Sequence, residues 1–184
     1  MIRTRALRSP LLSAILILPL YALVGQNASP PGSNSYSEVE RQYIARLDSI
    51  LFDYFELMDT HVDRSRPYYE GYAMFRQRIR NGESGFAVAL DSDSTVYGGA
   101  WFSVRPESGE YWIAVGRGLI DIHHRHPSLV YAVITHELRH ARDYLLDPDN
   151  FLEHNDDPID KHLFERAAAY IEGLFIDEVL IPRG

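Results

Sequence analysis

Cysteine is absent from the 184 residues, and basic residues are few. Without cysteine, no disulfide supports the fold, and a lipid-modified cysteine is excluded. Three of the 18 basic residues lie within the first ten positions, whereas all 26 acidic residues follow position 37. The rest of the chain therefore has 15 basic residues against 26 acidic ones, a net charge of about −11. A chain this acidic is a poor partner for nucleic acid or an anionic membrane surface, so both are excluded.

Long apolar runs are also scarce, and the one that exists lies at the start of the chain. It reads LLSAILILPLYALVG (Leu11 to Gly25), follows a basic start and precedes small polar residues. This order is typical of a secretory signal peptide, which we predict for residues 1–28. The alternative is an uncleaved membrane anchor, which Pro19 and the short run disfavour. After cleavage no span remains, so the leader predicts an exported protein, periplasmic or secreted. Because it has no disulfides, an exported protein of this kind fits a bacterial periplasm better than a eukaryotic exterior.

The remainder is predicted to be one domain, residues 37–184, behind a flexible linker, residues 29–36, that is rich in Pro, Ser and Gly. Ser37 and Glu40 form a capping box, and an apolar stripe then predicts a helix to Thr60. A second helix is predicted from Pro67 to Arg80. The domain therefore begins with one or two helices.

Three runs of aromatic and β-branched residues follow, separated by turn residues. They are FAVAL (86–90), TVYGGAWFSV (95–104) and YWIAVG (111–116). This pattern predicts a small antiparallel sheet of about three strands. Gly98 and Gly99 inside the second run predict a bulge or a close approach by another backbone.

The last third of the chain predicts two further helices. One follows Pro127 and ends at Asp147-Pro148, and the other begins at Pro158 and ends before Pro182. The stretch DPDNFLEHNDDP between them is expected to be an acidic loop. The fold class is therefore α+β: helices, a small sheet, then helix, loop and helix.

The stretch ITHELRHARDYL (134–145) contains His-Glu-x-x-His on the first of these helices. His136 and His140 are four residues apart, so they project to the same side, close enough to bind one ion. Zinc favours imidazole nitrogen, and a catalytic zinc site keeps three protein ligands and a water. Glu137 lies about 100° from His136 and about 60° from His140, where a base can take a proton from that water.

The alternative interpretation is two incidental surface histidines. The chance expectation of such a motif in this composition is roughly 0.02 occurrences. Leu129, Ala132 and Val133 form an apolar stripe that leads to the two histidines, which predicts that they lie on the buried face. Buried histidines beside a glutamate require a metal or dense hydrogen bonding, which favours zinc.

With a small sheet before it and a second helix after it, HELRH resembles the zincin metallopeptidases, over roughly Phe86 to Leu180. The metzincin branch is excluded, because Asp143 and Leu146 stand where its glycine and third histidine would be. In the gluzincin branch the third ligand is a glutamate on a following helix. The resemblance therefore implies Glu165, 25 residues after His140, as that ligand.

The helix pattern supports Glu165 independently. Ala168 and Ala169 share a face with it, and small residues let two helices approach closely. A solvated surface glutamate is the alternative. Glu172, on the same face, is also a candidate partner for a ligand imidazole. The other candidates for the third ligand are His162, Glu172, His154 and Asp160.

The resemblance implies an exported metallopeptidase that uses Zn²⁺ to activate a water and hydrolyses peptide bonds of a peptide or protein substrate. Glu137 would be the general base and would pass its proton to the leaving amine. An edge strand beside the site would bind substrate as an added strand. The sequence predicts no oligomeric state. Candidates to stabilise the oxyanion are Tyr131, Tyr144, Tyr170 and His126.

A non-catalytic zinc-binding or protein-interaction module on a zincin-like fold is the alternative function. A purely structural site would have no need of Glu137 and would normally add a fourth ligand. The segment HHRH (123–126) is interpreted as a solvated loop, because three histidines in four residues cannot all face one ion.

Overall fold

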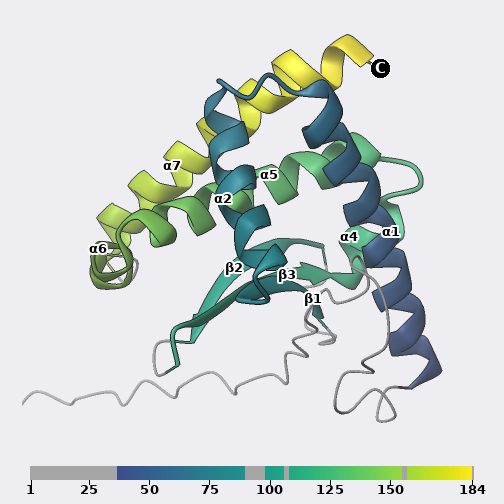
Figure 1. The fold of residues 1–184 in the computed structure, drawn as a ribbon, viewed down its shortest axis with the longest axis horizontal. Coiled ribbons are helices and arrows are strands. Elements are labelled where there is room, and N and C mark those ends of the chain that lie inside the picture. The colour runs from purple at the N-terminus through teal and green to yellow at the C-terminus, as the bar shows by residue number, and fades with distance from the viewer. Residues whose placement is uncertain (1–36, 90–97, 106–107, 155–156, 184) are drawn as a thin grey trace, which may run out of the picture.

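The computed structural model describes residues 37–89, 98–105, 108–154 and 157–183 (Figure 1). The predicted signal peptide and linker lie outside these ranges. None of the helices within them combines the length and apolar content that crossing a membrane requires.

Two helices open the domain, as predicted. Helix α1 (Glu38–His61) begins at a capping box in which Glu40 N–H donates to Ser37 Oγ and Ser37 N–H donates to Glu40 Oε2. Helix α2 (Pro67–Arg80) begins with proline, whose fixed φ suits the first helical position. Both helices bury one apolar face in the core.

The sheet contains β1 (Ser84–Ala89), β2 (Ala100–Arg105) and β3 (Glu110–Gly116). Its order is β1-β3-β2, with β2 antiparallel and β1 parallel to β3. The predicted α+β class and the three strands are confirmed, but the sheet is mixed, so the prediction that it is antiparallel throughout is wrong. Because each strand reverses the direction of the one before, the first and third run the same way, and here they are neighbours. Gly98 and Gly99 precede β2 and do not interrupt it.

The helices cover one face of this sheet (Figure 1). Phe86 and Ile113 are buried there in a core shared with α1, α2 and the later helices. A short helix that the sequence pattern did not predict, α4 (Arg117–Ile122), continues directly from β3.

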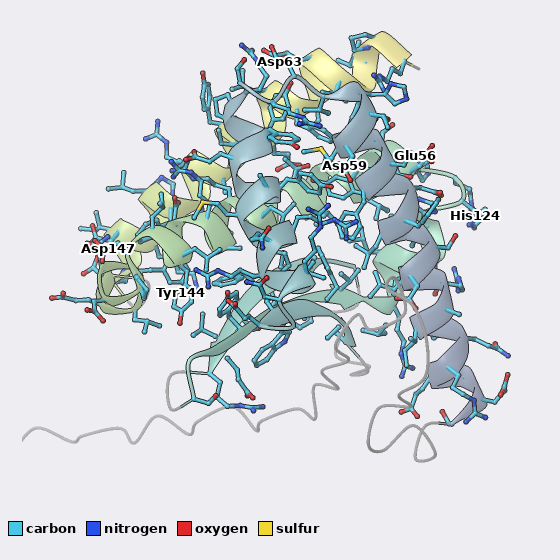
Figure 2. The ribbon with its side chains drawn as sticks, viewed as in Figure 1. Glu56, Asp59, Asp63, His124, Tyr144 and Asp147 are labelled. Atoms are coloured by element: carbon cyan, nitrogen blue, oxygen red, sulfur yellow. The ribbon has the colours of Figure 1, made fainter. Side chains whose placement is uncertain are left out.

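Helix α5 (Pro127–Leu146) crosses above the sheet (Figure 1). Helix α7 (Pro158–Phe175) packs against α5 and runs in the opposite direction. The predicted acidic loop between them contains helix α6 (Pro148–His154), so that prediction is wrong in part. Asp147, at the end of α5 in Figure 2, accepts a hydrogen bond from Asn150 N–H and so caps α6. The chain ends in a π-helical turn, η3 (Ile176–Leu180), and a 3₁₀ turn, η4 (Ile181–Arg183).

Helix α2 approaches α5 very closely at one glycine. A Cβ atom added to Gly71 would lie 2.6 Å from the backbone oxygen of Leu138, so a larger residue would force the two helices apart. The contact fixes the middle of α5, the part that carries the His-Glu-x-x-His motif.

Candidate metal centre

Helix α5 is the central helix of the domain, packed against α2, α7 and β2. Its buried surface differs from the predicted stripe, because Leu129 is 49% exposed. A helix with neighbours on several sides is buried around most of its circumference, so a single stripe is a poor guide. The residues of α5 that are 1% exposed or less are Val130, Ala132, Ile134, Thr135, Leu138 and Ala141.

The structure brings His136, His140 and Glu165 together, with one ligand atom of each within 4.8 Å of the other two. The two Nε2 atoms are 3.2 Å apart, and the Glu165 oxygens lie 3.3 Å from His136 Nε2 and 3.6 Å from His140 Nε2. Tetrahedral zinc with bonds of about 2.0–2.1 Å separates its ligand atoms by about 3.3 Å. The donor set and its spacing could therefore hold a metal ion.

Of the other candidates for the third ligand, those whose side chains the structure describes are not part of this group. His162 is exposed, and the side chain of His154 lies outside the described residues. Asp160 lines a different pocket, between α5 and α7. Among the residues that the structure describes, three potential ligand atoms converge in the His136, His140 and Glu165 group.

Glu172 lies behind the site and orients a histidine. Its Oε2 is 3.0 Å from His136 Nδ1, so an Nδ1–H bond to this carboxylate leaves Nε2 free to face His140 and Glu165. Metal-binding histidines are usually held in this way, by a carboxylate or carbonyl on the other ring nitrogen.

Glu137 is buried beside the cluster, with 7% of its surface exposed. Its Oε2 accepts a hydrogen bond of 2.7 Å from Phe102 N–H on β2. Burial raises the pKa of Glu137 to about 7, and the nearby His136 limits that rise. Glu137 is therefore held by the sheet and does not contribute a ligand atom to the three-residue group.

The two histidines differ in their preference for a proton. Burial opposes protonation of His136, but its hydrogen bond to Glu172 and the surrounding carboxylates raise its pKa. Burial and the neighbouring His136 lower the pKa of His140. His140 is thus the neutral partner, the form in which imidazole binds a metal.

A pocket of about 600 Å³ opens beside the cluster. Trp101, Phe102, Val104, Phe151 and Leu152 form its apolar wall, and Glu137, His140, Glu165 and Lys161 supply its charged and polar side chains. Sequence reasoning missed Lys161. The signal that could have found it is its position four residues before Glu165, on the same face of α7.

The four candidates for oxyanion stabilisation lie elsewhere, and none lines this pocket. Figure 2 shows Tyr144 on the sheet side of α5, where it packs against Phe102. Tyr170 is exposed, Tyr131 lies against His123, and His126 is the residue just before α5.

The HHRH segment also lies away from the cluster. Figure 2 places His124 at the end of α5 opposite Asp147, and its Nδ1 is 2.8 Å from the backbone oxygen of Asp121.

No family model, curated protein or solved structure matches the chain.

Proposed function

We propose that this chain is a zinc-dependent metallopeptidase with a zincin-like, gluzincin-type site. The observation that carries the proposal is the convergence of His136, His140 and Glu165, with Glu137 buried beside them and uninvolved as a ligand. This combination is what hydrolysis by a metal-activated water requires.

Each residue has a separate role. His136, His140 and Glu165 would hold the zinc, and Glu172 would orient His136. A bound zinc supplies Lewis-acid chemistry, acidifying water and polarising a carbonyl group. Glu137 takes the proton from the attacking water and delivers it to the nitrogen of the leaving amine.

One edge of the sheet, at β2, suits binding of an extended peptide. Strand β2 lies at the edge, and Gly116 N–H donates to Gly99 C=O, which sets which β2 residues bond to β3. By this alternation, Ala100, Phe102 and Val104 direct their backbone groups away from β3. Glu137 Oε2 already accepts the Phe102 N–H, so a peptide would pair with the outward groups of Ala100 and Val104 and with the Phe102 carbonyl. All three line the pocket, so a peptide added to β2 would lie beside Glu137.

Zinc content and peptide hydrolysis test the proposal together. The protein, expressed from the full chain and purified without a histidine tag or chelator, should contain about one zinc per chain. Glu165→Ala should lose the zinc, whereas Glu137→Ala should keep it and lose hydrolysis. The matched control is His162→Ala, which removes an exposed histidine of α7, the helix of Glu165, and should change neither zinc content nor hydrolysis.

Two results would contradict the proposal. A folded protein that takes up no zinc would leave HELRH as two histidines on an inner helix face. Zinc binding without hydrolysis of any peptide would instead favour the non-catalytic zinc module.

A further inference from the structure

Lys161 is the only lysine in the chain, and it lines the pocket beside the metal cluster. It lies on α7 one turn before Glu165, so both side chains project from the same face of the helix. A positive charge is thus placed in the pocket that His140 and Glu165 also line.

This charge has no acidic partner within the described part of the chain. Glu165 is the usual partner for a residue four positions away, but its two oxygens face His136 and His140, at 3.3 and 3.6 Å. The cations of α5 are paired in contrast: Arg139 with Asp143, and Arg142 with Glu70 and Asp143. The Lys161 ammonium is therefore available to a ligand in the pocket.

The ammonium of Lys161 indicates the sign of that ligand, because a cation without a partner attracts an anionic group. The carboxylates around the site are engaged elsewhere: Glu165 faces the two histidines, Glu172 bonds to His136 Nδ1, and Glu137 accepts from Phe102 N–H. The pocket wall near it is apolar, formed in part by Phe151 and Leu152. A cation at the edge of an apolar pocket favours an anionic group on a ligand that is otherwise apolar.

We propose that Lys161 binds a carboxylate of the peptide substrate, one or two residues from the bond that is cleaved. This inference rests on the proposed function and names the substrate class for the same site. The distance follows from the helix: one turn is about 5.4 Å, and an extended residue spans about 3.3–3.6 Å. The carboxylate can belong to the C-terminus of the peptide or to an acidic side chain.

Three matched tetrapeptides distinguish these two sources. All are acetylated and apolar: one has a free C-terminal carboxylate, one a C-terminal amide, and one an amide with glutamate as its last residue. Dissociation constants are measured on zinc-loaded Glu137→Gln protein, and kcat/KM on protein with Glu137 intact. Each is repeated with Lys161→Met, with Lys161→Arg and with Arg166→Met, which removes an exposed cation of α7 outside the pocket.

The free acid or the glutamate peptide should bind about tenfold more tightly than the plain amide, as expected for a partly solvated charge-assisted hydrogen bond. Lys161→Met should abolish this preference and leave the amide unchanged. Lys161→Arg and Arg166→Met should preserve it. Preference for the free acid identifies the C-terminus, and preference for the glutamate peptide identifies a side chain. Equal binding of all three peptides, or equal weakening of all three by Lys161→Met, would overturn the inference.

A readout independent of hydrolysis separates this inference from the proposed function. Because Lys161 is the only lysine, reductive ¹³C-methylation gives one side-chain NMR signal, apart from that of the terminal amine. That signal should shift on addition of a carboxylate peptide and not of the plain amide. If no peptide is hydrolysed but the signal shifts, the peptidase proposal fails and the carboxylate site stands. If peptides are hydrolysed and the signal does not respond, the carboxylate site fails and the peptidase proposal stands.

Discussion

Replacement of Glu172 by alanine should weaken zinc binding without removing a ligand. The Glu172 carboxylate lies 3.0 Å from His136 Nδ1, and the two side chains are 26% and 17% exposed. Without this bond, the His136 ring loses the contact that selects its tautomer and its orientation. Zinc then has to bind an imidazole that is free to rotate, so affinity falls while the number of ligands stays at three.

The expected loss is about tenfold in the dissociation constant. Partners of metal-bound histidines are worth about 10–100-fold in affinity, or about 1.4–2.7 kcal/mol. Because Glu172 is partly exposed, water can replace some of the bond, which places the loss at the lower end. Glu172→Gln keeps an acceptor oxygen but loses the charge, so a smaller loss is expected.

Competition with a chromogenic chelator at fixed pH measures this affinity. Asp177→Asn removes an exposed carboxylate just beyond the end of α7 and serves as the control, with no change expected. Unchanged affinity in Glu172→Ala would refute the orienting role. A loss of a thousandfold or more would show that Glu172 is itself a ligand.

Three further predictions concern stability. Free zinc at a hundred times its dissociation constant should add about 2.7 kcal/mol to the free energy of unfolding and raise Tm by about 5–11 °C. A chelator should reverse the rise, and an unchanged Tm would contradict zinc binding to the folded state. Gly71→Ala should lower the free energy of unfolding, measured by chemical denaturation, by about 1–3 kcal/mol, because the new Cβ meets the Leu138 backbone. Gly173→Ala, with open space around it, should instead stabilise by up to about 1 kcal/mol, and equal effects of the two changes would contradict the close crossing. Thr135→Val should lower the free energy of unfolding by about 1–3 kcal/mol, because the buried Tyr54 hydroxyl loses its partner at 3.0 Å. Adding Tyr54→Phe should recover most of that loss; if the double variant is no more stable than Thr135→Val, the hydrogen bond is not the cause.

Features set by neighbours along the chain were predictable from the sequence. The start of α1 follows from the capping box of Ser37 and Glu40, which form their bonds within one turn. The pairing of His136 with His140 also follows from helix geometry alone, because four residues make about one turn. In each case the interacting groups are less than five residues apart.

Features set by distant contacts were not predictable. Strand propensity does not specify which strand becomes the neighbour of another, so the parallel pairing of β1 with β3 was missed. The exposure of Leu129 has the same origin, because the faces of α5 that are buried depend on where α2, α7 and β2 pack. Glu165 was predicted to be the third ligand through a resemblance, since residue spacing alone left four other candidates open.

One face of α7 carries the second half of the site. Lys161, Glu165, Ala168 and Glu172 follow one another at steps of four, three and four residues, which is the spacing of a single helical stripe. Ala168 is fully buried, and its small side chain allows the close approach that brings Glu165 to the histidines. The same approach sets Glu172 behind His136 and Lys161 in the pocket. The position of Lys161 thus follows from that of Glu165, because a helix that presents Glu165 to the two histidines also presents the residue one turn earlier.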